Sequence, residues 1–308
     1  MREVTEGLVH VAGNAVLDIL LRGAGEVESG GDTWADNVQR LQSPVDAALG
    51  GCGAAAAYVL GALGQQVSLN ANIGRDIWGG ILRAWLEKVE VEVGGLTAAN
   101  TAVHAIALDD RGRRRSHYYT GEKVDWRASL EGAVPHYLLA SGYGGVDAED
   151  LRELAALFSR LRRLGTRVVF DPSPWFAGRV SVADMHALWR EVDCLLGTEE
   201  ELLHWQEADS IEDLTERVLD RGVERVVVKR GPKGAFYAAR DGSQGPVSVE
   251  EVSAANSVGA GDSFNGRLVY GLCRQENLSD AVFAAAQLAT RVVQNGRGAL
   301  GAIEFERE

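Results

Sequence analysis

The sequence contains few cysteines, and none of them lies near another. Among 308 residues the chain has 3 Cys, which are Cys52, Cys194 and Cys273. Their number and spacing exclude a disulfide framework and a cysteine-based metal site, and they indicate buried thiols in a reducing cytosol. The 6 His residues likewise show no short metal-ligating spacing. We therefore expect a cytoplasmic protein without a Cys- or His-based metal site.

Long apolar runs and basic residues are also scarce. No stretch reaches the roughly 18 to 20 consecutive apolar residues that a transmembrane helix needs. The apolar run at 8–21 is interrupted by His10, Asn14 and Asp18 and follows no basic leader, so we expect no signal peptide. With 31 Lys+Arg against 44 Asp+Glu, the net charge of -13 disfavours nucleic acid as a partner. We expect no membrane partner either.

Apolar segments of strand length alternate with longer segments of helical period. The periodicity predicts strands at 8–12, 16–21, 67–72, 102–108, 137–141, 167–171, 194–197, 225–229 and 235–238. It predicts helices at 52–63, 78–86, 148–164, 211–221, 262–274 and 279–294. Near-continuous apolar strands such as "RVVF" and "RVVVK" are typical of a parallel sheet covered on both faces. We therefore predict an α/β fold, with a doubly wound, mostly parallel central sheet and helices on both of its faces.

Two segments of the N-terminal half interrupt this alternation. Residues 23–46 are polar and rich in glycine, and residues 92–125 carry a hairpin-like pattern that turns at "DDRGRRR". We predict that these segments form a small β lid on a single domain that spans residues 1–308. Because side chains alternate along a strand, Arg113 and Arg115 would point to one face of the hairpin and Arg114 to the other.

The segment "NSVGAGDSFNGR" at 256–267 is the most informative motif. Gly259, Ala260 and Gly261 form a small-residue turn, Asp262 follows, and an apolar pattern of helical period begins there. A glycine-rich turn that opens a helix exposes unpaired N–H groups and positive potential, which suit a phosphate. A carboxylate beside a phosphate makes sense if it takes a proton from the attacking hydroxyl. The alternative is a plain tight turn with Asp262 as helix cap.

Several motifs together resemble the ribokinase-like, or PfkB, family of carbohydrate kinases. "NSVGAGDSF" followed by "NG" resembles its C-terminal signature, and "LGGCGAAAAYVLGALG" its N-terminal di-glycine signature. "HVAGNAVLDILL" resembles the first strand, "VVFDPSP" the mid-chain strand end, "GTEEELLHW" the N-x-x-E segment, and "VVVKRGPKGAFYA" the strand and turn near the nucleotide. These motifs occur in the family's order over nearly the whole chain.

The resemblance implies an ATP-dependent kinase that phosphorylates a hydroxymethyl group of a sugar or sugar-like alcohol, with ATP and Mg²⁺ as cofactors. It makes Asp262 the general base, and it makes the N–H groups of Gly259, Ala260, Gly261 and Asp262 an anion hole. The other matched positions are Asp18, Asn14, Gly50 and Gly51 for the substrate, Thr198, Lys229, Gly231, Gly234 and Asn295 for the nucleotide, and Glu201 for Mg²⁺.

Four positions depart from the family pattern. Ala55 stands where an Asn usually binds the sugar, and Thr198 replaces the Asn of N-x-x-E. Asn256 replaces the acid that opens the C-terminal signature and helps to hold an activating K⁺, which makes cation activation doubtful. Trp175 lies near the place of a common Arg. Recognition of the substrate must therefore differ from that of typical members.

The sequence leaves several alternatives open. "GCGAAA" at 51–56 fits a dinucleotide fingerprint, but no buried strand precedes it, which argues against a dehydrogenase. A nucleoside kinase remains an alternative, because the aromatic residues Trp34, Tyr118, Tyr119 and Trp175 could stack on a base. A catalytically inactive nucleotide- or sugar-binding protein is a further alternative.

The lid raises two more questions. If the substrate itself carries a phosphate, the lid residues Arg111, Arg113, Arg114 and Arg115 could anchor it, although they would otherwise form a solvated hairpin tip. Family lids often pair between subunits, and an unpaired sheet edge is a liability in a monomer, so we expect a homodimer. The substrate, the phosphorylated hydroxyl and the pathway do not follow from the sequence.

Overall fold

The computed structural model describes residues 3–24, 38–109, 113–252 and 257–305, and a nine-stranded sheet forms its body. Its strands lie in the order β13 (Gln244–Val247), β12 (Ala235–Ala239), β11 (Arg225–Lys229), β10 (Cys194–Thr198), β9 (Arg167–Asp171), β8 (Val134–Ser141), β1 (Val4–Ala12), β4 (Val67–Asn70) and β5 (Glu92–Gly94). All neighbouring pairs from β11 to β5 are parallel, and β12 and β13 add an antiparallel edge. The predicted mostly parallel sheet is confirmed.

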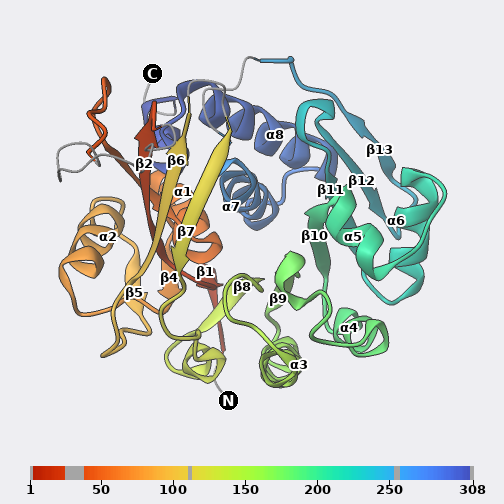
Figure 1. Ribbon diagram of the computed structural model, residues 1–308. Coiled ribbons are helices and arrows are strands. Elements are labelled where there is room, and N and C mark those ends of the chain that lie inside the picture. The colour runs from red at the N-terminus through yellow and green to blue at the C-terminus, as the bar shows by residue number, and fades with distance from the viewer. Residues whose placement is uncertain (1–2, 25–37, 110–112, 253–256, 306–308) are drawn as a thin grey trace.

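Helices cover both faces of this sheet (Figure 1). Alternate residues of β8 show the arrangement: Leu139 packs into one buried cluster, whereas Leu138 and Ala140 pack into another. The Leu139 cluster includes residues of α1 (Cys52–Ala62), α2 (Ile77–Glu87), α7 (Ala260–Cys273) and α8 (Leu278–Asn295). The other cluster includes residues of α3 (Ala148–Arg163), α4 (Val182–Trp189), α5 (Glu199–Trp205) and α6 (Ile211–Asp220). Because both faces of the sheet are buried, successive residues of its strands are apolar.

The helices predicted from periodicity correspond to α1, α2, α3, α6, α7 and α8, with ends that differ by a few residues. The prediction did not include α4 and α5, which have 8 and 7 residues and are too short to show a clear period. Four short 3-10 segments complete the described chain: η2 (Trp126–Leu130), η3 (Pro174–Phe176), η4 (Gly231–Lys233) and η5 (Gly298–Phe305). No helix in these parts of the chain combines the length and hydropathy that crossing a bilayer requires.

A second sheet, which we call the lid, consists of β3 (Asp46–Gly50), β2 (Val16–Arg22), β6 (Ala102–Leu108) and β7 (Arg114–Tyr119) in that order. β2 and β6 are parallel, and the other two pairs are antiparallel. The segment 92–125 contributes β6 and β7 to the lid, but its residues 92–94 form β5 of the body sheet, so the predicted lid boundary is wrong there. The segment 23–46 joins β2 to β3, and its residues 25–37 lie outside the described part of the chain.

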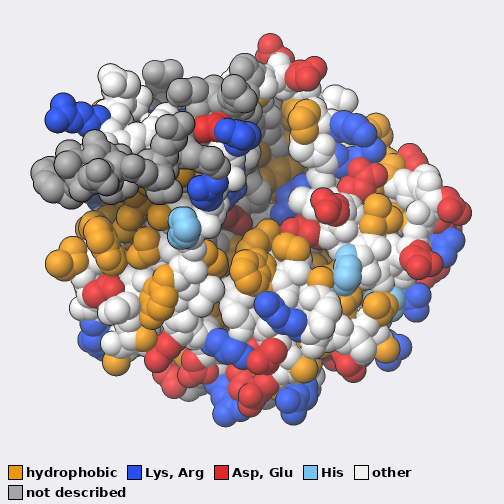
Figure 2. Space-filling view, viewed as in Figure 1, with side chains coloured by type: hydrophobic (Ala, Val, Ile, Leu, Met, Phe, Trp, Pro, Cys, Tyr) orange, Lys and Arg blue, Asp and Glu red, His pale blue; other side chains and the backbone are white. Residues whose placement is uncertain are grey.

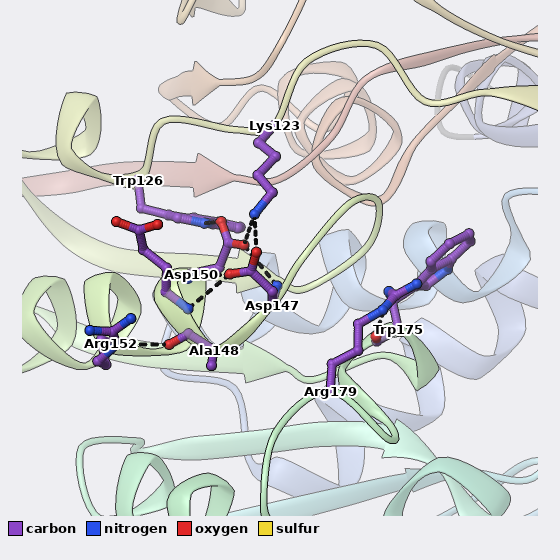
Figure 3. A network of polar contacts seen from close by, with 9 residues as sticks. Lys123, Trp126, Asp147, Ala148, Asp150, Arg152, Trp175 and Arg179 are labelled. Carbon is purple, nitrogen blue, oxygen red and sulfur yellow. Dashed lines mark hydrogen bonds and ion pairs between the residues drawn. The ribbon is translucent and has the colours of Figure 1, made fainter.

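The chain that returns from the lid to the body is held at the start of α3 (Figure 3). Lys123 forms ion pairs with Asp147 at 2.5 Å and with Asp150 at 3.0 Å, and Trp126 donates its indole N–H to Asp150 at 2.9 Å. The Lys123 ammonium holds the pKa of Asp147 well below its usual value. Asp147 also caps α3 by accepting the backbone N–H groups of Glu149 and Asp150. These contacts fix the loop between β8 and α3 relative to the lid.

Candidate active site

The N-terminus of α7 has the anion-binding turn that its glycines predict, and we call the N–H groups of Gly261 and Asp262 the anion cradle. Gly259 has φ 78°, a left-handed conformation that favours glycine, and the Ser263 N–H closes the first turn on the Gly259 carbonyl at 2.9 Å. The Ala260 N–H donates to the Ser257 carbonyl at 3.3 Å. Among the described residues, the N–H groups of Gly261 and Asp262 have no acceptor. These N–H groups are therefore available to an anion.

Asp262 lies in the first turn of α7, and its carboxyl group is surrounded by charged groups. Burial raises the pKa of Asp262 to about 7. Lys229 opposes this rise, whereas three other carboxylates, Asp171, Asp18 and Glu201, add to it. A carboxyl group with a pKa near neutrality can exchange a proton at physiological pH. The structure thus brings predicted residues from α7, the lid, β11 and α5 around one point.

Lys229 forms part of a buried polar network in this cluster. Its Nζ lies 2.8 Å from Asp171 Oδ2 and 3.3 Å from Asn265 Oδ1, and the Asn265 amide donates to Asp171 Oδ2 at 2.7 Å. Burial lowers the pKa of Lys229, but the carboxylates of Asp171, Glu201 and Asp262 outweigh it and raise the pKa. The side chain therefore stays an ammonium ion beside the cradle, where it can stabilise phosphate charge.

Glu201 is held by a capping box at the start of α5. The Thr198 hydroxyl accepts the Glu201 N–H at 3.2 Å, and Glu201 Oε2 accepts the Thr198 N–H at 2.7 Å. The Tyr143 hydroxyl donates to Glu201 Oε1 at 3.2 Å. Burial and the carboxylates of Asp171, Glu201 and Asp262 raise the pKa of Tyr143, so that its hydroxyl remains a donor. Both carboxylate oxygens of Glu201 are thus fixed in direction.

The donor set near Glu201 fits Mg²⁺ bound through water. Among the described residues, no group of three or more His, Cys, Asp or Glu side chains could enclose a metal ion. Mg²⁺ usually keeps several waters and takes one or two carboxylates together with substrate phosphates. A single oriented carboxylate beside an anion cradle meets this requirement, so Glu201 and the phosphates of a bound nucleotide would hold the ion.

The predicted substrate residues meet where β2, β3 and α1 converge. Asp18 on β2 is 4% exposed and lies against Gly50, where a Cβ would stand 2.2 Å from Asp18 Oδ2. Gly51 has φ 83°, and a Cβ there would lie 2.5 Å from the Asn14 carbonyl oxygen. Asn14 Oδ1 accepts the Cys52 N–H at 3.0 Å. Only glycine fits both positions of the di-glycine, which leaves room for the carboxylate and the chain beside it.

Three predicted nucleotide residues make contacts outside this cluster. Gly231 has φ 56° and opens η4, and Gly234 has φ 79° and packs against the backbone of β13. The Asn295 amide donates to the Gly301 carbonyl at 3.3 Å and accepts the Arg297 N–H at 2.9 Å. Their role in nucleotide binding remains a prediction.

The departures from the family pattern have different structural settings. Ala55 is fully buried in α1, where small residues let the helix approach α7: a Cβ at Gly266 would lie 2.8 Å from the Ala56 carbonyl oxygen. Trp175 in η3 makes an edge contact with Tyr118 of the lid, with 6.1 Å between ring centroids. The predictions on Asn256, Trp34 and Arg111 concern residues outside the described ranges.

Sequence reasoning did not assign site roles to Asp171, Tyr143, Asn265 and His104. Asp171 ends β9, and Tyr143 follows the end of β8 by two residues. In parallel α/β sheets, ligands bind beyond the carboxyl ends of the strands, so this position was an available signal for both. Asn265 and His104 lie inside a helix and a strand, where no such signal exists. Figure 2 shows a hollow at the junction of lid and body, with acidic side chains inside and basic ones near its rim.

The lid lies over the carboxyl ends of parallel strands, and a glycine turn and an Asp open α7. A comparison with protein-family models agrees with this arrangement. The family model described as pfkB family carbohydrate kinase matches residues 12–303. The chain belongs to this family. Fructokinase-1 of Oryza sativa subsp. japonica is 25% identical over 280 residues, which cover 84% of this chain and 86% of that protein.

Two solved structures share the fold. Ribokinase from Thermotoga maritima superposes with a TM-score of 0.74 at 23% identity, over 96% of this chain and 98% of that one. A candidate ribokinase II from E. coli, solved in complex with ATP and Mg²⁺, superposes with a TM-score of 0.74 at 19% identity, over 97% of this chain and 99% of that one. The ribokinase-like architecture predicted from the motifs is therefore confirmed.

Proposed function

We propose that this pfkB family member transfers the γ-phosphoryl group of ATP to a hydroxymethyl group of a sugar or sugar-like alcohol. The observation that carries this proposal is Asp262, a carboxyl group with a pKa of about 7 beside two N–H groups that have no acceptor among the described residues. A base and an anion cradle at one helix terminus are what phosphoryl transfer to an alcohol requires.

The reaction follows from these groups. Asp262 in its ionised form takes the proton of the acceptor hydroxyl, and the oxygen bonds to the γ-phosphorus. The bond between the γ-phosphorus and the bridging oxygen breaks, and that oxygen leaves with ADP. The N–H groups of Gly261 and Asp262 and the ammonium of Lys229 stabilise the charge on the transferred group. Asp18 from the lid and Asn14 from the loop between β1 and β2 orient the acceptor.

ATP and Mg²⁺ are the proposed cofactors, which agrees with the ligands of the E. coli structure. Mg²⁺, when bound, supplies positive charge that offsets the phosphate oxygens. Glu201 would hold it through water, and Thr198 and Tyr143 keep the Glu201 carboxylate in place. A homodimer formed through the lid remains a prediction, which light scattering of the purified protein tests.

The test is a coupled ADP-release assay with Mg²⁺ and ATP. The acceptor panel contains D-fructose, D-ribose, 2-keto-3-deoxy-D-gluconate, D-fructose 6-phosphate and adenosine, and Asp262→Asn is the control variant. We expect one acceptor to give a rate that the variant loses. Adenosine represents the second candidate, a nucleoside kinase, which the aromatic contact of Tyr118 with Trp175 favours. ADP release that Asp262→Asn leaves unchanged would contradict the mechanism.

A further inference from the structure

His104 of β6 lies between a carboxylate and a guanidinium on the face of the lid that bears Asp18. Its cross-strand neighbours are Asp18 on β2 and Tyr118 on β7. His104 Nδ1 is 3.4 Å from Asp18 Oδ1, and His104 Nε2 is 3.4 Å from an Nη of Arg114. Each ring nitrogen therefore faces one charged group.

The two neighbours determine which nitrogen carries the proton. A guanidinium has only donors, so Arg114 can approach Nε2 only where this nitrogen has a lone pair. A carboxylate has only acceptors, so Nδ1 can approach Asp18 favourably only where it carries a hydrogen. The arrangement thus favours a hydrogen on Nδ1, which faces Asp18, and a lone pair on Nε2, which faces Arg114. Arg114 directs the donor of His104 toward Asp18.

The orientation of the His104 ring is fixed by an aromatic contact. The centroids of His104 and Tyr118 are 5.3 Å apart, and Tyr118 contacts Trp175 of the body at 6.1 Å. The Tyr118 hydroxyl accepts the amide N–H of Asn14 at 3.2 Å. The ring of His104 is therefore held by contacts from the lid and, through Tyr118, from the body.

Asp18 has little other freedom. It is 4% exposed, and its Oδ2 lies against Gly50. Fixing Oδ1 through His104 sets the plane of the carboxylate and so the directions of its remaining lone pairs. We propose that His104 is a positioning residue that orients Asp18 to accept hydroxyl groups of the phosphoryl acceptor, and that Arg114 supports it. This inference rests on the proposed kinase function.

The test compares two substitutions of His104 in the full-length protein. His104→Leu keeps a similar volume without a donor, whereas the amide nitrogen of His104→Asn can occupy the place of Nδ1. We expect His104→Leu to raise the KM of the acceptor about tenfold or more, the usual effect of losing a hydrogen bond to a charged group. We expect the KM of ATP to change less than about twofold, and His104→Asn to restore most of the acceptor KM. The acceptor is the compound with the highest rate among D-fructose, D-ribose, 2-keto-3-deoxy-D-gluconate, D-fructose 6-phosphate and adenosine.

Two further variants complete the experiment. His117→Leu is the matched control, because His117 pairs with Ala105 on the opposite face of the same hairpin and is exposed. Arg114→Met changes an exposed side chain, so it tests the inference even where His104→Leu does not fold. We expect it to raise the acceptor KM about threefold, the effect of a weak hydrogen bond, without changing the KM of ATP.

The outcomes separate this inference from the proposed function. Three results would overturn the role of His104 while leaving the proposed function intact. They are equal changes in the KM of the acceptor and of ATP, an unchanged acceptor KM in both Arg114→Met and His104→Leu, and an acceptor KM in His104→Asn as high as in His104→Leu. Absence of ADP release by the wild-type protein with every acceptor would overturn the proposed function, and the inference with it.

Discussion

Lys229 and Asp171 form an ion pair of 2.8 Å that joins the end of β11 to the end of β9. Both side chains are largely buried, at 13% and 2% exposure, and Asn265 of α7 bonds to both of them. Since α7 also carries Asp262, this network couples the strand ends of the body to the helix that holds the proposed base. The cation that faces the phosphate cradle is thus already held in place by protein groups.

We expect Lys229→Met to lose activity and stability together. The substitution keeps the length of the side chain but removes the charge that stabilises the transferred phosphoryl group, so kcat should fall about 100-fold or more. It also leaves Asp171 buried without its cation, which should lower the free energy of unfolding by about 3 kcal/mol. Steady-state kinetics and urea denaturation measure the two effects. Lys233→Met is the control, because Lys233 is exposed in η4, and it should change neither quantity.

The pKa of Asp262 predicts how the rate depends on pH. Only the ionised carboxylate can accept the hydroxyl proton, and its pKa is raised to about 7, chiefly by burial. We therefore expect kcat/KM to rise with pH through about 7 and to level off above it. Lys229 is the group that lowers this pKa. In Lys229→Met the residual activity should consequently reach its plateau at higher pH, and a profile that stays in place would contradict the assignment.

The same shift predicts a stability effect of Asp262→Asn. Between the ordinary pKa of 3.8 and about 7, the folded protein holds a proton on Asp262 that the unfolded chain has released. Stability contributed by this group therefore falls as pH rises through that window. The amide of Asp262→Asn does not titrate, so the variant should gain in melting temperature relative to wild type as pH rises from about 4 to 7. A constant difference across that range would show that Asp262 has an ordinary pKa.

The sequence predicted the parts of the protein that depend on local order. Period-2 and 3.6-residue patterns located the long strands and helices, and the glycines at 259 and 261 predicted a turn before a helix, where Gly259 has a φ of 78°. The glycine turn also predicted the position of Asp262 at a helix start, because a helix terminus is a local feature.

The contacts of the site could not be predicted in the same way. The ion pair of Lys229 with Asp171 joins residues 58 positions apart, and the hydrogen bond of Tyr143 to Glu201 spans the same separation. Such pairs follow from the order of strands in the sheet, which one sequence does not state. The capping box of Thr198 and Glu201 is a local motif, yet the same residues were assigned to nucleotide and metal from the resemblance. The box is compatible with those roles, since it orients the carboxylate.

We expect Gly50→Ala to disturb the acceptor side of the site without affecting the nucleotide. A Cβ at this position would lie 2.2 Å from Asp18 Oδ2, so the carboxylate must move. The KM of the acceptor should rise about tenfold, the effect of losing one hydrogen bond to a charged group, while the KM of ATP stays the same. Gly80→Ala is the control, because its Cβ would meet only the end of the Arg83 side chain at 4.0 Å in α2. Similar kinetics for both variants would contradict the role of Gly50.

Tyr143 provides a test of the metal assignment that is independent of the acceptor. Tyr143→Phe removes the donor to Glu201 Oε1, and a carboxylate with one free oxygen should hold a metal-bound water less well. We expect the Mg²⁺ concentration for half-maximal rate to rise about tenfold, within the range seen when such outer contacts are lost. Calorimetry measures the same effect without catalysis, by comparing the affinity for ATP in the presence of Mg²⁺ with the affinity in the presence of a chelator. We expect this difference to be smaller in Tyr143→Phe than in the wild-type protein. Tyr137→Phe is a matched control, because the Tyr137 hydroxyl donates at the same 3.2 Å to the Leu272 carbonyl between β8 and α7. If both variants lose stability to a similar degree and only Tyr143→Phe loses the gain in ATP affinity that Mg²⁺ provides, then Glu201 acts on the metal. If neither variant changes that gain, the capping box is the whole function of Glu201.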